Sequence, residues 1–312
     1  MDRIEIPNQA TYSPVALSDL LLVAPFAARL MFRSTLPGMV IQAATFGAYA
    51  GSALRDWAAR RDMRRIDFLD EFGADVFELQ STPEPVREAE VRSLVERLND
   101  EYVTPEGTLD EVAPKVNHHL TRFMASVTGQ VVETSSEIRR FSVAGLLMPM
   151  AYGACDIISG DIAIFRELGL LQAHVVTHEM VHRKGYWKEI HAQVLSYFSL
   201  MTSGEPEFVQ SALAERLHRQ LQVLSGDDGE VFHARVEELG LREELEAEFH
   251  KFQPKLPTPQ AGLAKGMRTL YDERMKITGQ NGLSDYWTGF TDFLYTFSQS
   301  TDAKQDQGLA RI

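Results

Sequence analysis

His-Glu-Met-Val-His, residues 178–182, stands within the apolar stretch Val-Val-Thr-His-Glu-Met-Val-His-Arg-Lys-Gly of residues 175–185. On a helix, residues four positions apart lie on one face, so His178 and His182 can direct both imidazoles at one metal ion. Glu179 is offset by about one-third of a turn, where a carboxylate can contact metal-bound water rather than the metal. The stretch therefore predicts a buried helix with two metal ligands and a base. The alternative is an amphipathic helix with two ordinary histidines.

These three side chains fit a metal-dependent hydrolase. Zinc lowers the pKa of a bound water to roughly 7, and a glutamate beside it can take the proton as the oxygen attacks a carbonyl. We therefore expect Zn²⁺ bound by His178 and His182, with Glu179 as the general base. Imidazole ligands also suit iron, so Fe²⁺ is the alternative metal.

A catalytic zinc site needs a third protein ligand. In the metzincin pattern this would be a histidine at position 188, where the chain has a lysine. In the gluzincin pattern a following helix supplies a glutamate, and the nearby candidates are Glu189 and His191. His191 lies on the apolar stripe of a second helix predicted over residues 187–201, after a chain reversal at Gly185. We therefore expect His191 to be the third ligand, with Glu189 as its substitute. The alternative for His191 is a core histidine bonded to backbone.

Composition limits the class of protein. The 312 residues suffice for a sizeable core, and 31 Lys and Arg against 44 Asp and Glu give a net charge of −13. Because there is no basic surplus to neutralise phosphates, we expect no nucleic-acid partner. Cys155 is the sole cysteine, which excludes an internal disulfide and a cysteine-rich zinc module. With no basic region typical of a signal peptide at the start, these features favour the cytoplasm.

The first part of the chain is apolar. Residues 16–32 carry a few charges, and residues 34–54 carry none. The uncharged run is long enough to cross a bilayer but is rich in alanine and glycine, so it fits either a membrane-associated helix or a buried helix. Arginines follow it at positions 55, 60, 61, 64 and 65. We expect residues 1–57 to form an N-terminal apolar segment, with membrane association through residues 16–54, and residues 58–312 to form the catalytic domain.

Patterns elsewhere predict an α+β fold that is mainly α, with a small sheet beside the metal helix. Residues 86–102 have apolar side chains at helical spacing, and residues 127–132 favour a strand. Residues 141–165 predict short strands with a hairpin over 156–165. We expect this part to form one wall of a cleft, where an extended substrate adds to a sheet edge as a strand. Further helices are predicted within residues 205–252, 264–277 and 284–297.

The surroundings of the motif resemble an uncharacterised bacterial family assigned as zinc metallopeptidases, of the zincin and gluzincin-like type. Members carry His-Glu-x-x-His-x-x-Gly-aromatic, which residues 178–186 match. They continue with Glu-x-Glu-Ala-Asn, where this chain has Glu-Ile-His-Ala-Gln at residues 189–193. Residues 144–150 and residues 271–286 are similar to flanking parts of the family.

The resemblance implies a zincin-like core with a helical C-terminal part, and N-terminal membrane segments are common in the family. It also implies that Tyr286 or His174 stabilises the oxyanion, with Tyr286 our expected catalytic partner of Glu179. His174 lies one turn before the motif and would otherwise be a pocket residue behind the ligands. The departure from the family is the histidine at position 191, which leaves a three-histidine site, a ligand set that also binds zinc.

We therefore expect a metal-dependent hydrolase, specifically a zinc metallopeptidase in which Glu179 is the general base for a metal-activated water. One alternative is an iron-dependent, oxygenase-type enzyme that acts on a small molecule. Another is an inactive zincin scaffold that serves for binding. The expected partner is a peptide or small-molecule substrate.

Overall fold

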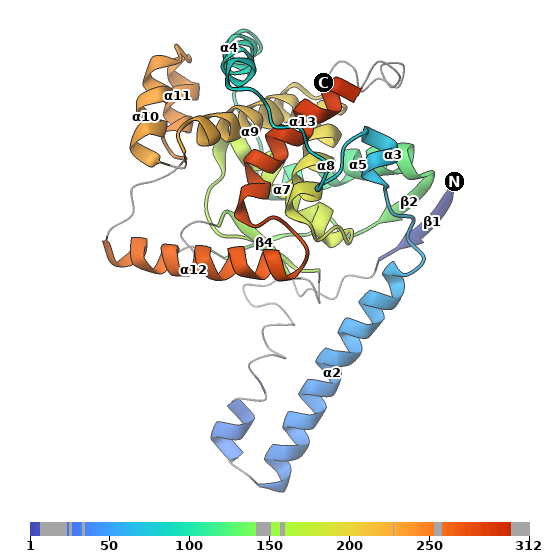
Figure 1. Ribbon diagram of the computed structural model, residues 1–312. Coiled ribbons are helices and arrows are strands. Elements are labelled where there is room, and N and C mark those ends of the chain that lie inside the picture. The colour runs from blue at the N-terminus through green and yellow to red at the C-terminus, as the bar shows by residue number, and fades with distance from the viewer. Residues whose placement is uncertain are drawn as a thin grey trace.

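The helix that carries the motif lies inside the body of the molecule (Figure 1). The computed structural model describes residues 1–6, 24, 27–32, 35–141, 151–156, 160–226, 228–252 and 258–300. The motif helix, α7, spans Gln172–Arg183, and all of its residues from Ala173 to Arg183 are buried. After a turn at Gly185, where φ is +93°, the next helix, α8, spans Glu189–Met201 and is almost entirely buried too. The two helices predicted around the motif are therefore present, and they pack against each other.

Three further helices pack around this pair. α5 (Leu109–Thr128) and α9 (Pro206–Leu224) each contact both α7 and α8, and α13 (Thr288–Ser300) contacts α8 and α9. The shared core consists of apolar side chains such as Val176 and Phe198, which are fully buried. Because side chains cover α7 and α8 on several sides, polar groups on these helices are held where water has little access.

Two small sheets flank the helical core. In one, β1 (Asp2–Glu5) pairs in parallel with β2 (Gln130–Glu133). In the other, β5 (Ile162–Ile164) is central, with β3 (Arg139–Arg140) parallel on one side and β4 (Gly153–Cys155) antiparallel on the other. β4 is thus an edge strand, and it lies against α7.

The predicted elements are found with shifted boundaries. The predicted strand at 127–132 is in fact the end of α5 followed by β2, because Gly129, with φ +69°, ends the helix. The predicted hairpin corresponds to β4 and β5, and part of its turn, residues 157–159, lies outside the described residues. The mainly helical α+β class is confirmed. The remaining described elements are α3 (Phe68–Phe72), α4 (Glu84–Asp100), the 3₁₀ turn η1 (Gly169–Leu171), α10 (Gly229–Glu238), α11 (Glu243–Phe249), α12 (Thr258–Ile277) and the 3₁₀ turn η2 (Leu283–Tyr286).

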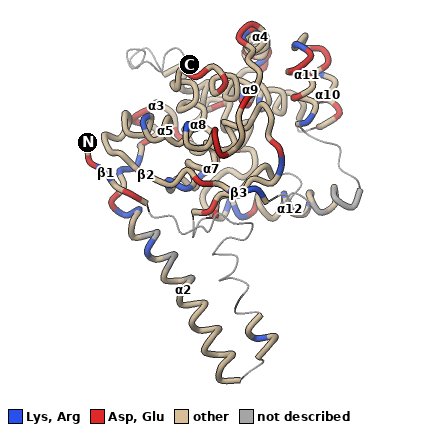
Figure 2. The backbone as a smooth tube through the Cα atoms, turned by 180° about the vertical axis from the view of Figure 1, so that it is seen from behind, with Lys and Arg blue, Asp and Glu red and all other residues tan. Residues whose placement is uncertain are grey.

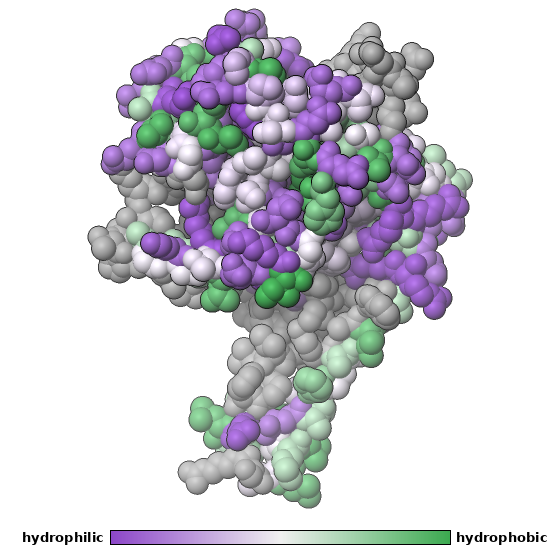
Figure 3. All heavy atoms as spheres, in the orientation of Figure 1, coloured by the Kyte–Doolittle hydropathy of each residue, from purple (hydrophilic) through white to green (hydrophobic). Residues whose placement is uncertain are grey.

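The longest helix, α2 (Leu36–Arg60), projects away from the body (Figure 1). Its large apolar side chains face solvent: Leu36 is 71% exposed, Phe46 68% and Leu54 64%. Figure 2 shows the arm without charge over most of its length, and Figure 3 shows its apolar surface below a largely hydrophilic body. No helix in the described parts of the chain has both the length and the apolar character needed to cross a membrane.

The base of this arm is tied to the motif helix. Arg60 Nη2 donates to the carbonyl oxygen of Arg183 at 3.1 Å, and Arg65 Nη1 donates to that of Gly185 at 2.6 Å. Two members of the arginine cluster are thus hydrogen-bond donors that satisfy the end of α7. At the start of the chain, β1 pairs with β2 in the body.

Candidate metal centre

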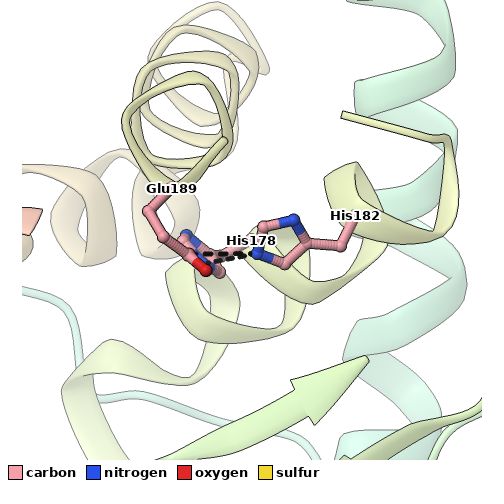
Figure 4. Close-up of side chains that lie close together, drawn as sticks. All are labelled: His178, His182 and Glu189. Carbon is pink, nitrogen blue, oxygen red and sulfur yellow. Dashed lines mark hydrogen bonds and ion pairs between the residues drawn. The ribbon is translucent and has the colours of Figure 1, made fainter. Parts of the chain in front are cut away.

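Three side chains from α7 and α8 meet at one point (Figure 4). Nε2 of His178 and Nε2 of His182 lie 3.1 Å apart, and each lies 3.1 Å from Oε2 of Glu189. Each residue is buried and offers one atom to a common ion. Ligand atoms bonded at about 2.0–2.2 Å lie roughly 3.3 Å apart around a tetrahedral ion and roughly 3.0 Å apart in cis positions of an octahedral one. The observed triangle has the dimensions of a metal site.

The third corner is Glu189 and not the expected His191. The ring of His191 stacks on Phe68, with centroids 3.8 Å apart and planes at 10°. Its nearest carboxylate is that of Asp75, at 4.0 Å from Nε2. Within Glu189–Leu200 of α8, His191 is the one residue that is only partly buried, and its ring packs on Phe68 of α3 rather than on the inward face that its stripe predicted. Glu189 is two residues earlier on α8, and it lies on the side of that helix which faces α7.

The orientation of His182 is fixed through the side of its ring that faces away from the metal position. Nδ1 donates to the carbonyl oxygen of Tyr186 at 2.7 Å, which leaves Nε2 directed at the site. The indole of Trp187 stacks on the imidazole, with centroids 6.0 Å apart and planes at 5°. Both contacts come from the turn after Gly185. The turn that joins the two ligand-bearing helices therefore also aims one of the ligands.

Charge in the site is balanced around Glu189. Burial opposes a charged carboxyl, but His182 and His178 hold the pKa of Glu189 well below its usual range. Burial likewise opposes a charged imidazole, yet the charge of Glu189 raises the pKa of His182 to about 9. Burial lowers the pKa of His178 to about 4. At neutral pH the three groups thus carry one negative and one positive charge, the latter a proton on a nitrogen that faces the metal position.

Glu179 does not point at this triangle but lies between α7 and the edge strand β4. Its carboxylate accepts the backbone N–H of Cys155, and a Cβ built at Gly153 would lie 3.5 Å from its Oε1. Burial raises the pKa of Glu179 to about 7, and the nearby Glu189 adds to this rise. The motif therefore supplies a carboxyl group beside the triangle that gains or loses a proton near neutral pH.

Two tyrosines from the C-terminal part complete the surroundings. Tyr271 donates its hydroxyl to Oε1 of Glu189 at 2.5 Å. Tyr286, the expected catalytic partner, hydrogen-bonds with both Tyr271 and Glu189, and its ring lies 5.9 Å from that of His178 at 23°. Burial raises the pKa of both phenols, so both remain donors at neutral pH. Tyr271 was not among the site residues predicted from the sequence.

His174 lies one turn behind the ligands in a buried polar network. Its Nε2 is 2.6 Å from Oε1 of Gln193, whose Nε2 donates to Oε1 of Glu215 at 3.1 Å. Since Gln193 is one turn after Glu189 on α8, this bond joins the two ligand-bearing helices directly. His174 is thus outside the triangle, and in this arrangement it supports the ligand-bearing helices.

No protein-family model, no curated protein and no solved structure matches this chain. The chemistry of the site therefore rests on its own residues and their geometry.

Proposed function

We propose that this chain is a metal-dependent hydrolase, with a zinc ion held by His178, His182 and Glu189. The observation that supports this most is the triangle of two imidazole nitrogens and one carboxylate oxygen with edges of 3.1 Å. Two histidines and a glutamate are a ligand set used by catalytic zinc, and three protein ligands leave a position open for water or substrate. A zinc ion held there would lower the pKa of a bound water and polarise a substrate carbonyl.

Glu179 is the proton acceptor in this proposal. It stands next to the triangle without belonging to it, and its pKa of about 7 suits a group that takes a proton and later returns it near neutral pH. The N–H of Cys155 holds its carboxylate at the edge strand β4, beside the triangle. Tyr286 remains protonated and can donate its hydroxyl to an oxygen that becomes negative.

A peptide is the substrate class that we propose, because an edge strand lies beside the base. The antiparallel pairing of β4 with β5 uses the backbone groups of Tyr152 and Asp156, which directs those of Gly153 and Cys155 away from β5. This outward edge faces Glu179. An extended peptide can add to such an edge, with its carbonyl carried toward the metal position. We propose a zincin-like arrangement on the same grounds.

Replacing Glu179 with Gln tests the assignment. We expect the variant to bind one zinc per chain and to lose hydrolysis of a peptide library by 100-fold or more, since the base contributes roughly 10²–10⁴-fold. Glu96→Gln, at an exposed position of α4, is the matched control and should keep full activity. A fully active Glu179→Gln protein would contradict the role of Glu179.

One observation favours a second candidate, an iron-dependent enzyme of the oxygenase type that acts on a small molecule. Two histidines and one carboxylate on one face are also the ligand set of non-haem Fe(II) oxygenases, and 3.1 Å suits cis positions of an octahedral ion. The position of Glu179 favours hydrolysis instead. Elemental analysis of the purified protein separates the two: near-stoichiometric iron with oxygen-dependent turnover would support the oxygenase.

We further propose that α2 contacts a lipid surface. Between Leu36 and Leu54 the helix has no charge, and its exposed apolar side chains point in several directions around its axis, which suits an apolar medium better than a single groove. Arg61 and Arg64, exposed at its base, match anionic headgroups.

Sedimentation with vesicles tests this contact. We expect the protein to bind vesicles that contain anionic lipid and to bind neutral ones less, and Phe46→Asp to weaken both interactions. Phe77→Asp, at an exposed site on the body, is the control. A wild-type protein that does not sediment with vesicles and instead forms dimers through α2 would contradict the lipid contact.

A further inference from the structure

The two oxygens of the Glu189 carboxylate are held in different ways. Oε2 lies 3.1 Å from Nε2 of both His178 and His182. Oε1 accepts the hydroxyl of Tyr271 at 2.5 Å, and Tyr286 adds a further hydrogen bond to the group. A carboxylate with one oxygen held by the Tyr271 hydroxyl presents the other more readily to a cation. Its contacts therefore favour binding of a metal through a single oxygen.

The backbone of Glu189 is held as well. Its N–H donates to the side-chain oxygen of Gln280 at 2.8 Å. Glu189 is the first residue of α8, and the residue before it, Lys188, provides no side-chain cap. The first N–H groups of a helix lack partners within the helix, and an acceptor from a cap residue normally satisfies one of them. Here Gln280 supplies that acceptor, so it fixes the point at which α8 begins.

Both contacts come from one short segment, residues 271–286, which begins in the second half of α12 and is held together by hydrogen bonds between its own residues. Oδ1 of Asp272 accepts the N–H of Leu283 at 2.8 Å, which joins α12 to η2. The N–H of Gln280 donates to the carbonyl oxygen of Met275 at 3.1 Å, and Met275 is buried. These bonds hold residues 271–286 in one shape. Tyr271 and Gln280 therefore reach Glu189 from a common support.

We propose that Tyr271 and Gln280 are positioning residues that make Glu189 a one-oxygen ligand in a fixed place. This rests on the proposed metal centre. A carboxylate free to turn would offer both oxygens and occupy a coordination position that water or substrate needs. The C-terminal segment thereby controls how open the metal is, although it supplies no ligand itself.

The experiment compares Tyr271→Phe and Gln280→Ala with wild type, and uses Tyr102→Phe as a matched control. Tyr102 lies under Arg242, with the guanidinium 4.0 Å from its ring, far along the chain from the site. Zinc affinity is measured by competition with a chromophoric chelator, and the Co²⁺-loaded proteins are compared by absorption spectrum. Hydrogen exchange of the amides at residues 189–193 is measured on metal-free protein.

We expect Tyr271→Phe to lose zinc affinity by about 10–100-fold, the usual effect of removing a partner of a ligand, and to change the Co²⁺ spectrum. Both variants should exchange faster at the start of α8, and Tyr102→Phe should match wild type. Unchanged affinity, spectrum and exchange in Tyr271→Phe would overturn the proposal. If wild type binds no metal, the proposed function fails. The exchange data then decide the positioning role alone: faster exchange in both variants supports it, and equal exchange overturns it.

Discussion

Replacing His191 with Phe separates the two candidate third ligands and carries a defined energetic consequence. His191 stacks on Phe68 and is 16% exposed, and its Nε2 has no hydrogen-bond partner among the residues that the structure describes. A phenyl ring can keep the stack and removes the orphaned nitrogen. Since Glu189 occupies the third corner of the triangle, we expect His191→Phe to keep its zinc affinity.

The magnitude follows from the pKa of His191, which burial lowers from 6.5 to about 3. Between these values the unfolded chain binds a proton that the folded chain does not, so stability rises with pH across this window. A pH of 5 is 1.5 units below the pKa of the imidazole in the unfolded chain. At about 1.36 kcal/mol per unit, this difference lowers the stability of the fold by about 2 kcal/mol. At pH 7.5 this cost is absent. Phenylalanine does not titrate and avoids it.

Urea unfolding of metal-free wild type and His191→Phe, at pH 5 and pH 7.5, measures the effect. The stability of the variant relative to wild type should be about 2 kcal/mol more favourable at pH 5 than at pH 7.5. Taking the difference between the two pH values removes any constant cost of fitting the larger ring. A difference that is the same at both pH values, or a loss of zinc at pH 7.5, would refute the reasoning and return His191 to the site.

Three other outcomes follow from the structure. Zinc affinity should rise about tenfold per pH unit toward pH 9, because binding displaces the proton on His182, whose pKa is about 9; a flat profile in chelator competition would contradict this. Arg87→Leu should cost about 3–5 kcal/mol in urea unfolding, because it leaves the buried Asp292 without its cation; Arg87→Leu combined with Asp292→Asn should recover part of the loss. Gly185→Ala should cost about 1–3 kcal/mol of stability, because φ at this position is +93°, and it should weaken zinc binding, because this turn orients His182. Gly204 also has a positive φ, but nothing lies close to it, so Gly204→Ala should leave zinc binding intact.

The sequence predicted the motif helix and its two histidines because both follow from local rules. The spacing of His178 and His182 fixes their common face on any helix, and the valines around them require burial. The reversal at Gly185 is equally local, since a positive φ at the end of a helix favours glycine.

The third ligand could not be chosen by the same rules. An apolar stripe shows which face of α8 is buried, but it does not show which neighbour covers that face. His191 is only partly buried and meets Phe68, while Glu189, the first residue of α8, meets the two histidines of α7. Tyr271 and Gln280 are separated from Glu189 by 82 and 91 positions, so no pattern near the motif could reveal them.

The two glutamates of the site show why residue type alone does not set a role. Both are buried, and burial raises the pKa of any carboxyl. For Glu189 two imidazoles outweigh that effect and keep it charged, as a ligand must be. Glu179 faces a strand edge with one N–H donor, and the charge of Glu189 pushes its pKa further up, to about 7. When the pKa values of two neighbouring carboxyl groups are shifted apart in this way, one group stays charged and stabilises charge, and the other can transfer protons. A change that removes the charge of Glu189, such as Glu189→Gln, also removes what keeps His182 charged, and His182 lowers the pKa of Glu179 more than Glu189 raises it. Glu189→Gln should therefore raise the pKa of Glu179 while it weakens metal binding. A ¹³C NMR titration of the Glu179 carboxyl in metal-free protein would show this, and an unchanged pKa would mean that burial alone sets it.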